Sequence, residues 1–87
     1  MDHLKELLKQ GATLVDVRKP EEFAAGHAPV AVNIPLDTLD EELLKWNKEH
    51  TFIIVCHTGT RSRIACKVLL NAGFTAVYDG GIWENFK

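Results

Sequence analysis

The chain contains four short apolar runs, and each of them predicts a β-strand. The predicted strands cover residues 13–17, 31–33, 51–55 and 76–78. The run Thr51-Phe52-Ile53-Ile54-Val55 is apolar and rich in β-branched residues, which is typical of a strand covered on both faces. Asp79-Gly80-Gly81 is expected to end the last strand, because paired glycines after an aspartate favour a turn.

Between these runs, apolar residues recur at helical spacing. A first predicted helix ends at Gly11 and carries Leu4, Leu7 and Leu8. Pro20 opens a short helical turn through Ala25, because proline fits the first turn of a helix. Asp37 or Thr38 can cap a helix that carries Leu39, Leu43, Leu44 and Trp46. A helix from Arg61 to Leu70 is predicted to place on one face Ile64, Ala65, Val68 and Leu69.

Strands and helices that alternate with short connections predict an α/β fold. We expect a small central parallel sheet of four to five strands with helices on both faces. In such sheets ligands bind outside the carboxyl ends of the strands. Cys56 follows the run at residues 51–55, and Arg18 and Gly80-Gly81 follow other strand ends. The functional site is therefore expected at this edge of the sheet.

Composition restricts the classes of function. The 87 residues suffice for one domain, spanning residues 1–87, and two cysteines do not make a disulfide framework. A net charge of −2 and a pI near 6.0 leave no basic stripe for nucleic acid. The first residues lack the apolar stretch of a secretory signal, and the apolar runs are too short to span a membrane. We expect a cytoplasmic protein that binds neither nucleic acid nor membrane.

The segment Cys56-His57-Thr58-Gly59-Thr60-Arg61-Ser62 places a thiol between a buried strand and the start of a helix. Such a junction aims unpaired backbone N–H groups at one point, which favours a negative charge there and hence a cysteine thiolate. A helix dipole supplies only about 0.3–1 kcal/mol. Further stabilisation is expected from N–H donors of the loop and from the guanidinium of Arg61. Gly59 is the natural position for positive φ.

Further motifs accompany this loop in a fixed order along nearly the whole chain. They are Leu14-Val15-Asp16-Val17-Arg18, Pro20-Glu21-Glu22-Phe23, Gly26-His27-Ala28-Pro29, Asn33-Ile34-Pro35, Gly73-Phe74, Val77-Tyr78 and Gly80-Gly81. With these motifs the chain resembles the rhodanese family of sulfurtransferases, single-domain type. The resemblance implies the rhodanese-like form of the fold predicted above.

The resemblance also implies a persulfide cycle. Cys56 would attack the outer sulfur of thiosulfate, a polysulfide or a persulfide-bearing protein, and would pass that sulfur to a thiol, cyanide or a protein acceptor. Arg61 would bind the negative group of the donor. The backbone N–H groups that would cradle the sulfur belong to His57, Thr58, Gly59, Thr60, Arg61 and Ser62. This chemistry needs no metal and no cofactor.

Two alternatives remain at this point. Phosphatases related to rhodaneses place five residues between cysteine and arginine, whereas four intervene between Cys56 and Arg61 here. A phosphatase or arsenate reductase is therefore the less favoured hypothesis. The second alternative is a rhodanese-like module that docks or regulates a partner without turnover.

Other residues are expected to be structural. Cys66 suits a small buried hydrophobe inside its helix. Asp16 and Arg18 are expected to hold the first strand by hydrogen bonds or by an ion pair with Glu22. The histidines show no metal-ligand spacing with the cysteines.

Overall fold

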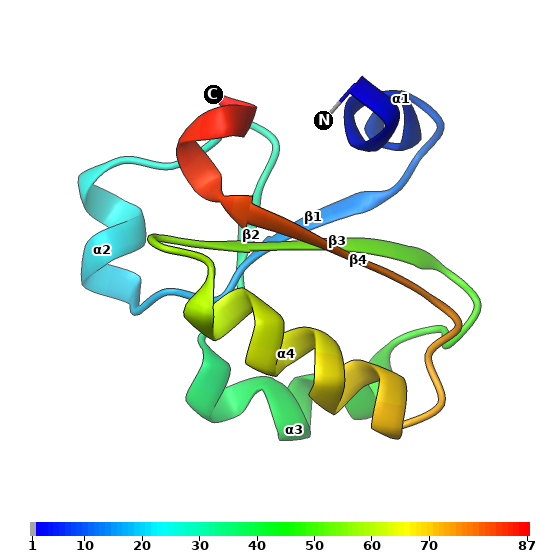
Figure 1. Ribbon diagram of the computed structural model, residues 1–87. Helices are drawn as coiled ribbons and strands as arrows, with labels where there is room; N and C mark the ends of the chain where they lie inside the picture. Colours follow the sequence, from blue (N-terminus) through cyan, green and yellow to red (C-terminus); the bar gives the residue numbers. More distant parts are fainter. Residues whose placement is uncertain (1) are drawn as a thin grey trace.

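The computed structural model describes residues 2–87, in which helices and strands alternate (Figure 1). The helices are α1 (Asp2–Lys9), α2 (Pro20–Ala25), α3 (Leu39–Glu42) and α4 (Thr60–Asn71). The strands are β1 (Thr13–Asp16), β2 (Val32–Asn33), β3 (Thr51–Cys56) and β4 (Ala76–Ile82). Short 3-10 helices, named η1, η2 and η3, lie at Leu36–Thr38, Leu43–Lys45 and Trp83–Phe86. No helix within residues 2–87 is long and apolar enough to cross a membrane.

The four strands form one parallel sheet in the order β2-β1-β3-β4, with helices on both faces, so the predicted fold class is confirmed. Side chains alternate across the sheet, because successive residues of a strand point to opposite faces. Leu14, Ile53 and Val55 pack beneath α1 and η3. Val15 and Ile54 pack on the other face, against α3 and α4 (Figure 1).

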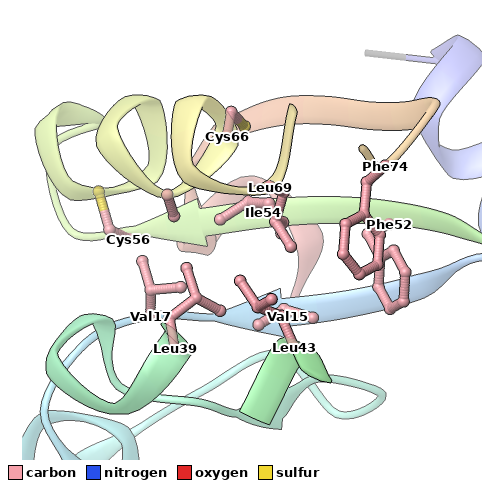
Figure 2. Packing of buried hydrophobic residues seen from close by; sticks show 11 residues of the cluster. Val15, Val17, Leu39, Leu43, Phe52, Ile54, Cys56, Cys66, Leu69 and Phe74 are labelled. Carbon is pink, nitrogen blue, oxygen red and sulfur yellow. The ribbon is translucent and has the colours of Figure 1, made fainter. Parts of the chain in front are cut away.

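The same alternation sets the direction of Cys56. It is the last residue of β3 and shares a face with Phe52 and Ile54. That face is covered by α4, so the thiol points from the strand end toward the helix that follows it (Figure 2). The position of the cysteine in the strand thus aims its sulfur at the N-terminal turn of α4.

The last strand is longer than the sequence indicated. Asp79-Gly80-Gly81 does not end β4 but forms a β-bulge inside it: Ile54 pairs with Asp79, whereas Val55 pairs with Gly81. A Cβ at Gly80 would lie 2.8 Å from Val55 Cγ1 and 2.9 Å from Ile53 Cγ2. Glycine is therefore needed at this position for close packing on β3, and the turn expected there is wrong.

Two helical faces also differ from expectation. The segment after Thr38 divides into α3 and η2, and a 3-10 turn does not stack residues four apart. Leu39 and Leu43 are still buried, but Leu44 is 81 % exposed and does not share their face. In α4 the buried residues are Ser62, Ala65, Cys66 and Leu69. Ile64 lies two positions after Ser62, on the far side of that helix, and is exposed.

Candidate active site

The loop between β3 and α4 is short because a glycine reverses its direction. Cys56 ends β3, and α4 begins at Thr60. Gly59, the residue before the helix, has φ of 97°, in the left-handed region where only glycine is unstrained. This turn brings the first N–H groups of α4 back over the end of β3.

The sulfur of Cys56 lies at the centre of this turn. Its Sγ accepts hydrogen bonds from the backbone N–H groups of Gly59 at 3.0 Å and Ser62 at 3.3 Å. The whole residue is 0 % exposed, whereas the loop residues His57, Thr58 and Thr60 are exposed. Hydrogen bonds donated to a sulfur stabilise its anionic form more than its neutral form. The arrangement is therefore suited to hold a negatively charged sulfur.

A link from β4 holds the loop in this shape. The buried Ser62 places its Oγ 2.8 Å from Asp79 Oδ1 and 3.0 Å from the Gly59 carbonyl oxygen, and its one proton can serve either acceptor. Asp79 Oδ1 also accepts the N–H of Gly81 at 3.0 Å. Sequence reasoning missed Asp79 because the bulge that contains it was interpreted as a strand end.

The Arg61 side chain forms an ion pair with a neighbouring helix. Its Nη1 and Nη2 donate to Glu22 Oε1 at 2.6 Å and Oε2 at 3.0 Å, so α2 is joined to the start of α4. These bonds, with a further one from the backbone N–H of Lys19, lower the pKa of Glu22 to about 2. The same bonds to Glu22 raise the pKa of Arg61, and a thiolate at Cys56 raises it further.

Of the two alternatives expected for Asp16 and Arg18, the hydrogen bonds are present, and the ion pair with Glu22 is absent because Glu22 pairs with Arg61. Asp16 and Arg18 instead pair with each other, through Arg18 Nε and Nη2 at 2.8–3.0 Å. Arg18 Nη2 also donates to the Gly26 carbonyl oxygen at 2.7 Å, and its guanidinium stacks 4.5 Å from the ring centre of Trp83. Because these contacts satisfy Arg18, Glu22 is left to pair with Arg61.

A cavity of about 320 Å³ opens beside the loop. The residues that line it come from the end of β1, from α2, from the cysteine loop and from η3, and are Arg18, Glu22, Ala25, Gly26, His57, Trp83 and Glu84. His57 directly follows Cys56, so this cavity adjoins the strand end that carries the thiol. Its charged groups include both signs, which does not suit a strongly anionic ligand.

Cys66 lies in α4 on the same face of the sheet but away from the loop (Figure 2). It is buried, in agreement with the structural role expected from the sequence. Burial raises the pKa of the Cys66 thiol to about 12, with a smaller contribution from the charge of Asp79.

We expect Cys66 to be inert toward alkylation in the folded protein. With a pKa near 12, its thiolate fraction at pH 8 is about a thousandfold below that of an ordinary cysteine. Iodoacetamide labelling of the Cys56→Ser variant, followed by mass spectrometry, measures this rate at Cys66 alone. The same variant in denaturant is the control, and equal rates with and without denaturant would contradict the expectation.

Comparison with known protein families and solved structures identifies the family of this chain. The model of the rhodanese-like domain matches residues 1–85. The chain belongs to the rhodanese-like family. Solved structures agree with this rhodanese-like assignment. The human single-domain sulfurtransferase TSTD1 is 30% identical, with a TM-score of 0.84 over 95% of this chain and 85% of that chain. A rhodanese-like domain protein from Staphylococcus aureus is 36% identical, with a TM-score of 0.82 over 99% of this chain and 86% of its own.

A rhodanese with anions from E. coli is 30% identical and has a TM-score of 0.79, over 86% of this chain and 91% of that chain. Membership of the rhodanese-like family, with sulfurtransferases among the similar structures, supports a role of the sulfurtransferase type. Within residues 2–87 of this rhodanese-like chain, no group of three or more His, Cys, Asp and Glu residues could hold a metal ion.

Proposed function

We propose that this protein is a sulfurtransferase that carries a sulfane sulfur as a persulfide on Cys56. The observation that carries the proposal is the pair of N–H groups, from Gly59 and Ser62, that donate to Cys56 Sγ. A thiolate is the nucleophilic form of cysteine, and these donors favour it. Cys56 also lies at the carboxyl end of a parallel strand, where sheets of this class bind ligands.

The first half-reaction is a displacement at sulfur. The Cys56 thiolate attacks the outer sulfur of thiosulfate or of another sulfane donor, and a bond forms between Sγ and that sulfur. With thiosulfate, the S–S bond of the donor breaks and sulfite leaves with the bonding electron pair. Negative charge passes from Sγ to the outer sulfur of the persulfide, so the N–H groups of the loop stabilise an anionic sulfur throughout.

The second half-reaction returns the enzyme to its starting form. A thiolate, cyanide or a nucleophile on an acceptor protein attacks the outer sulfur, and Sγ leaves as the thiolate. The cavity beside His57 is the proposed approach for this acceptor, since it adjoins the loop and is open enough for a small thiol or the tip of a protein side chain. Because Cys56 is fully buried, the exposed loop residues have to move for either partner to reach Sγ.

The size of the loop favours sulfur over phosphate. Four residues separate Cys56 from Arg61, and the N–H groups of Gly59 and Ser62 already converge on a single sulfur atom. A phosphoryl group has three peripheral oxygens, each of which needs its own donor. In addition, Arg61 is bonded to Glu22 rather than free to bind an incoming phosphate.

The test is to locate the transferred sulfur. The protein is incubated with thiosulfate or inorganic polysulfide, and intact mass and peptide mapping follow. We expect a gain of one sulfur on Cys56 that cyanide removes as thiocyanate. A gain located on Cys66, or no gain with either donor in folded protein, would refute the proposal.

A further inference from the structure

We propose that Glu22 is a specificity-determining residue, which neutralises Arg61 and thereby disfavours doubly charged sulfur donors relative to donors that carry one charge or none. This inference rests on the proposed function, because it concerns which donors reach Cys56. It predicts that the protein discriminates against thiosulfate by charge rather than by shape, and that one carboxylate causes the discrimination.

The first argument is geometric. Glu22 uses both carboxylate oxygens and Arg61 uses two nitrogens of its guanidinium, so the two groups face each other as a fork. Glu22 is also held by its own helix, since the Lys19 N–H donates to Oε1 at 3.1 Å. An anionic donor can bind the Arg61 guanidinium only if it displaces the Glu22 carboxylate, which is already oriented toward that guanidinium.

The second argument is the charge around the loop. Arg18 is matched by the fully buried Asp16 and adds little net charge to the cavity beside His57. Glu22 lines this cavity, and its partner Arg61 lines a second cavity of about 340 Å³. The other ionic groups that line the two cavities are Lys19, Asp37 and Glu84. With Glu22 present, the positive and negative groups nearly cancel, and a dianion is not attracted.

Two donors that differ by one charge test the proposal. Thiosulfate is a dianion and methanethiosulfonate is a monoanion, and both give their outer sulfur to a thiolate, with sulfite or methanesulfinate as the leaving group. The energy between a fixed charge and a donor is proportional to the charge of the donor. If E22Q adds one net positive charge near Cys56, kcat/KM is expected to rise about tenfold for thiosulfate and about threefold for methanethiosulfonate.

The measured quantity is therefore the ratio of kcat/KM for the two donors, which is expected to rise about threefold in E22Q. Glutamine retains an oxygen for the Lys19 N–H, so the helix start is preserved. The matched control is E21Q, since Glu21 is an exposed neighbour on α2 and its replacement removes the same charge. The rise in E22Q is also expected to shrink at high ionic strength, which a purely structural effect of the substitution would not do.

Alkylation gives a readout that does not depend on sulfur transfer. In a Cys66→Ala background, the rates of Cys56 with iodoacetate, a monoanion, and neutral iodoacetamide are compared. Both reagents attack the same thiolate and need the same loop opening, so their ratio reports the local charge alone. E22Q is expected to raise the iodoacetate-to-iodoacetamide ratio about threefold and E21Q to leave it unchanged.

The two proposals can fail separately. If no donor places sulfur on Cys56, the proposed function is wrong, and the alkylation ratio still decides the role of Glu22. An alkylation ratio that is the same in E22Q and in the unsubstituted protein overturns the Glu22 proposal. Equal increases in E22Q and E21Q also overturn it, because they would show a general effect of surface charge.

Discussion

Replacement of Cys56 with serine is expected to lower the rate of persulfide formation by at least about a thousandfold. A serine hydroxyl stays protonated near neutral pH and cannot replace the thiolate as the nucleophile. The loop itself should survive, because serine fits the position and its oxygen can accept the N–H groups of Gly59 and Ser62. Thiocyanate production from thiosulfate and cyanide measures the loss in turnover, and intact mass measures the loss of the persulfide.

Cys66→Ala is the matched control for this substitution. Cys66 is buried on the same face of the sheet but is not part of the loop, so its replacement should keep the rate within about twofold. If Cys56→Ser and the unsubstituted protein gave equal thiocyanate, Cys56 would not be the sulfur carrier. If neither folded protein transferred sulfur from any donor, the alternative of an interaction module without turnover would become the better one.

The fold was predictable because the pattern of apolar residues in each buried strand depends on which faces of that strand are covered. The run from Thr51 to Val55 lies at the centre of the sheet, where both faces are covered, and only a continuous apolar run satisfies both. The helix that carries Leu4, Leu7 and Leu8 packs its apolar stripe on one face of the sheet, so helical spacing was sufficient to predict it. Local propensity and tertiary packing agree at these positions.

Sequence reasoning failed where one local sequence fits two structures and only tertiary packing decides between them. Asp79-Gly80-Gly81 has the composition of a turn, and only the contact of Gly80 with Val55 and Ile53 reveals a bulge. The partner of Arg61 was missed for a similar reason. Glu22 and Arg61 are 39 positions apart, and several carboxylates were available before the chain was folded. Placement of Cys56, by contrast, followed from its position directly after a buried strand.

The pairing of Asp16, the last residue of β1, with Arg18 has a consequence for stability. The Asp16 side chain is 0 % exposed and that of Arg18 is 5 % exposed, and four hydrogen bonds join the two residues. We expect Asp16→Asn to lower the free energy of unfolding by about 3–5 kcal/mol, because it leaves the Arg18 charge buried without a counter-ion. Chains of this length typically have a total stability of about 4–13 kcal/mol. Urea denaturation of the variant measures the loss.

Three further variants, which are Glu6→Gln, Arg18→Met and the double variant Asp16→Asn/Arg18→Met, separate the buried charge from other effects of the substitution. Glu6→Gln removes a carboxylate from the exposed ion pair with Lys9 and should change stability by less than about 1 kcal/mol. The double variant Asp16→Asn/Arg18→Met removes both buried charges, so its loss should be smaller than the sum of the two single losses by at least about 1 kcal/mol. Additive losses would show that the ion pair is not what holds Arg18 against Trp83 and Gly26. The cavity beside Cys56 would then depend on the stacking and the carbonyl contact instead.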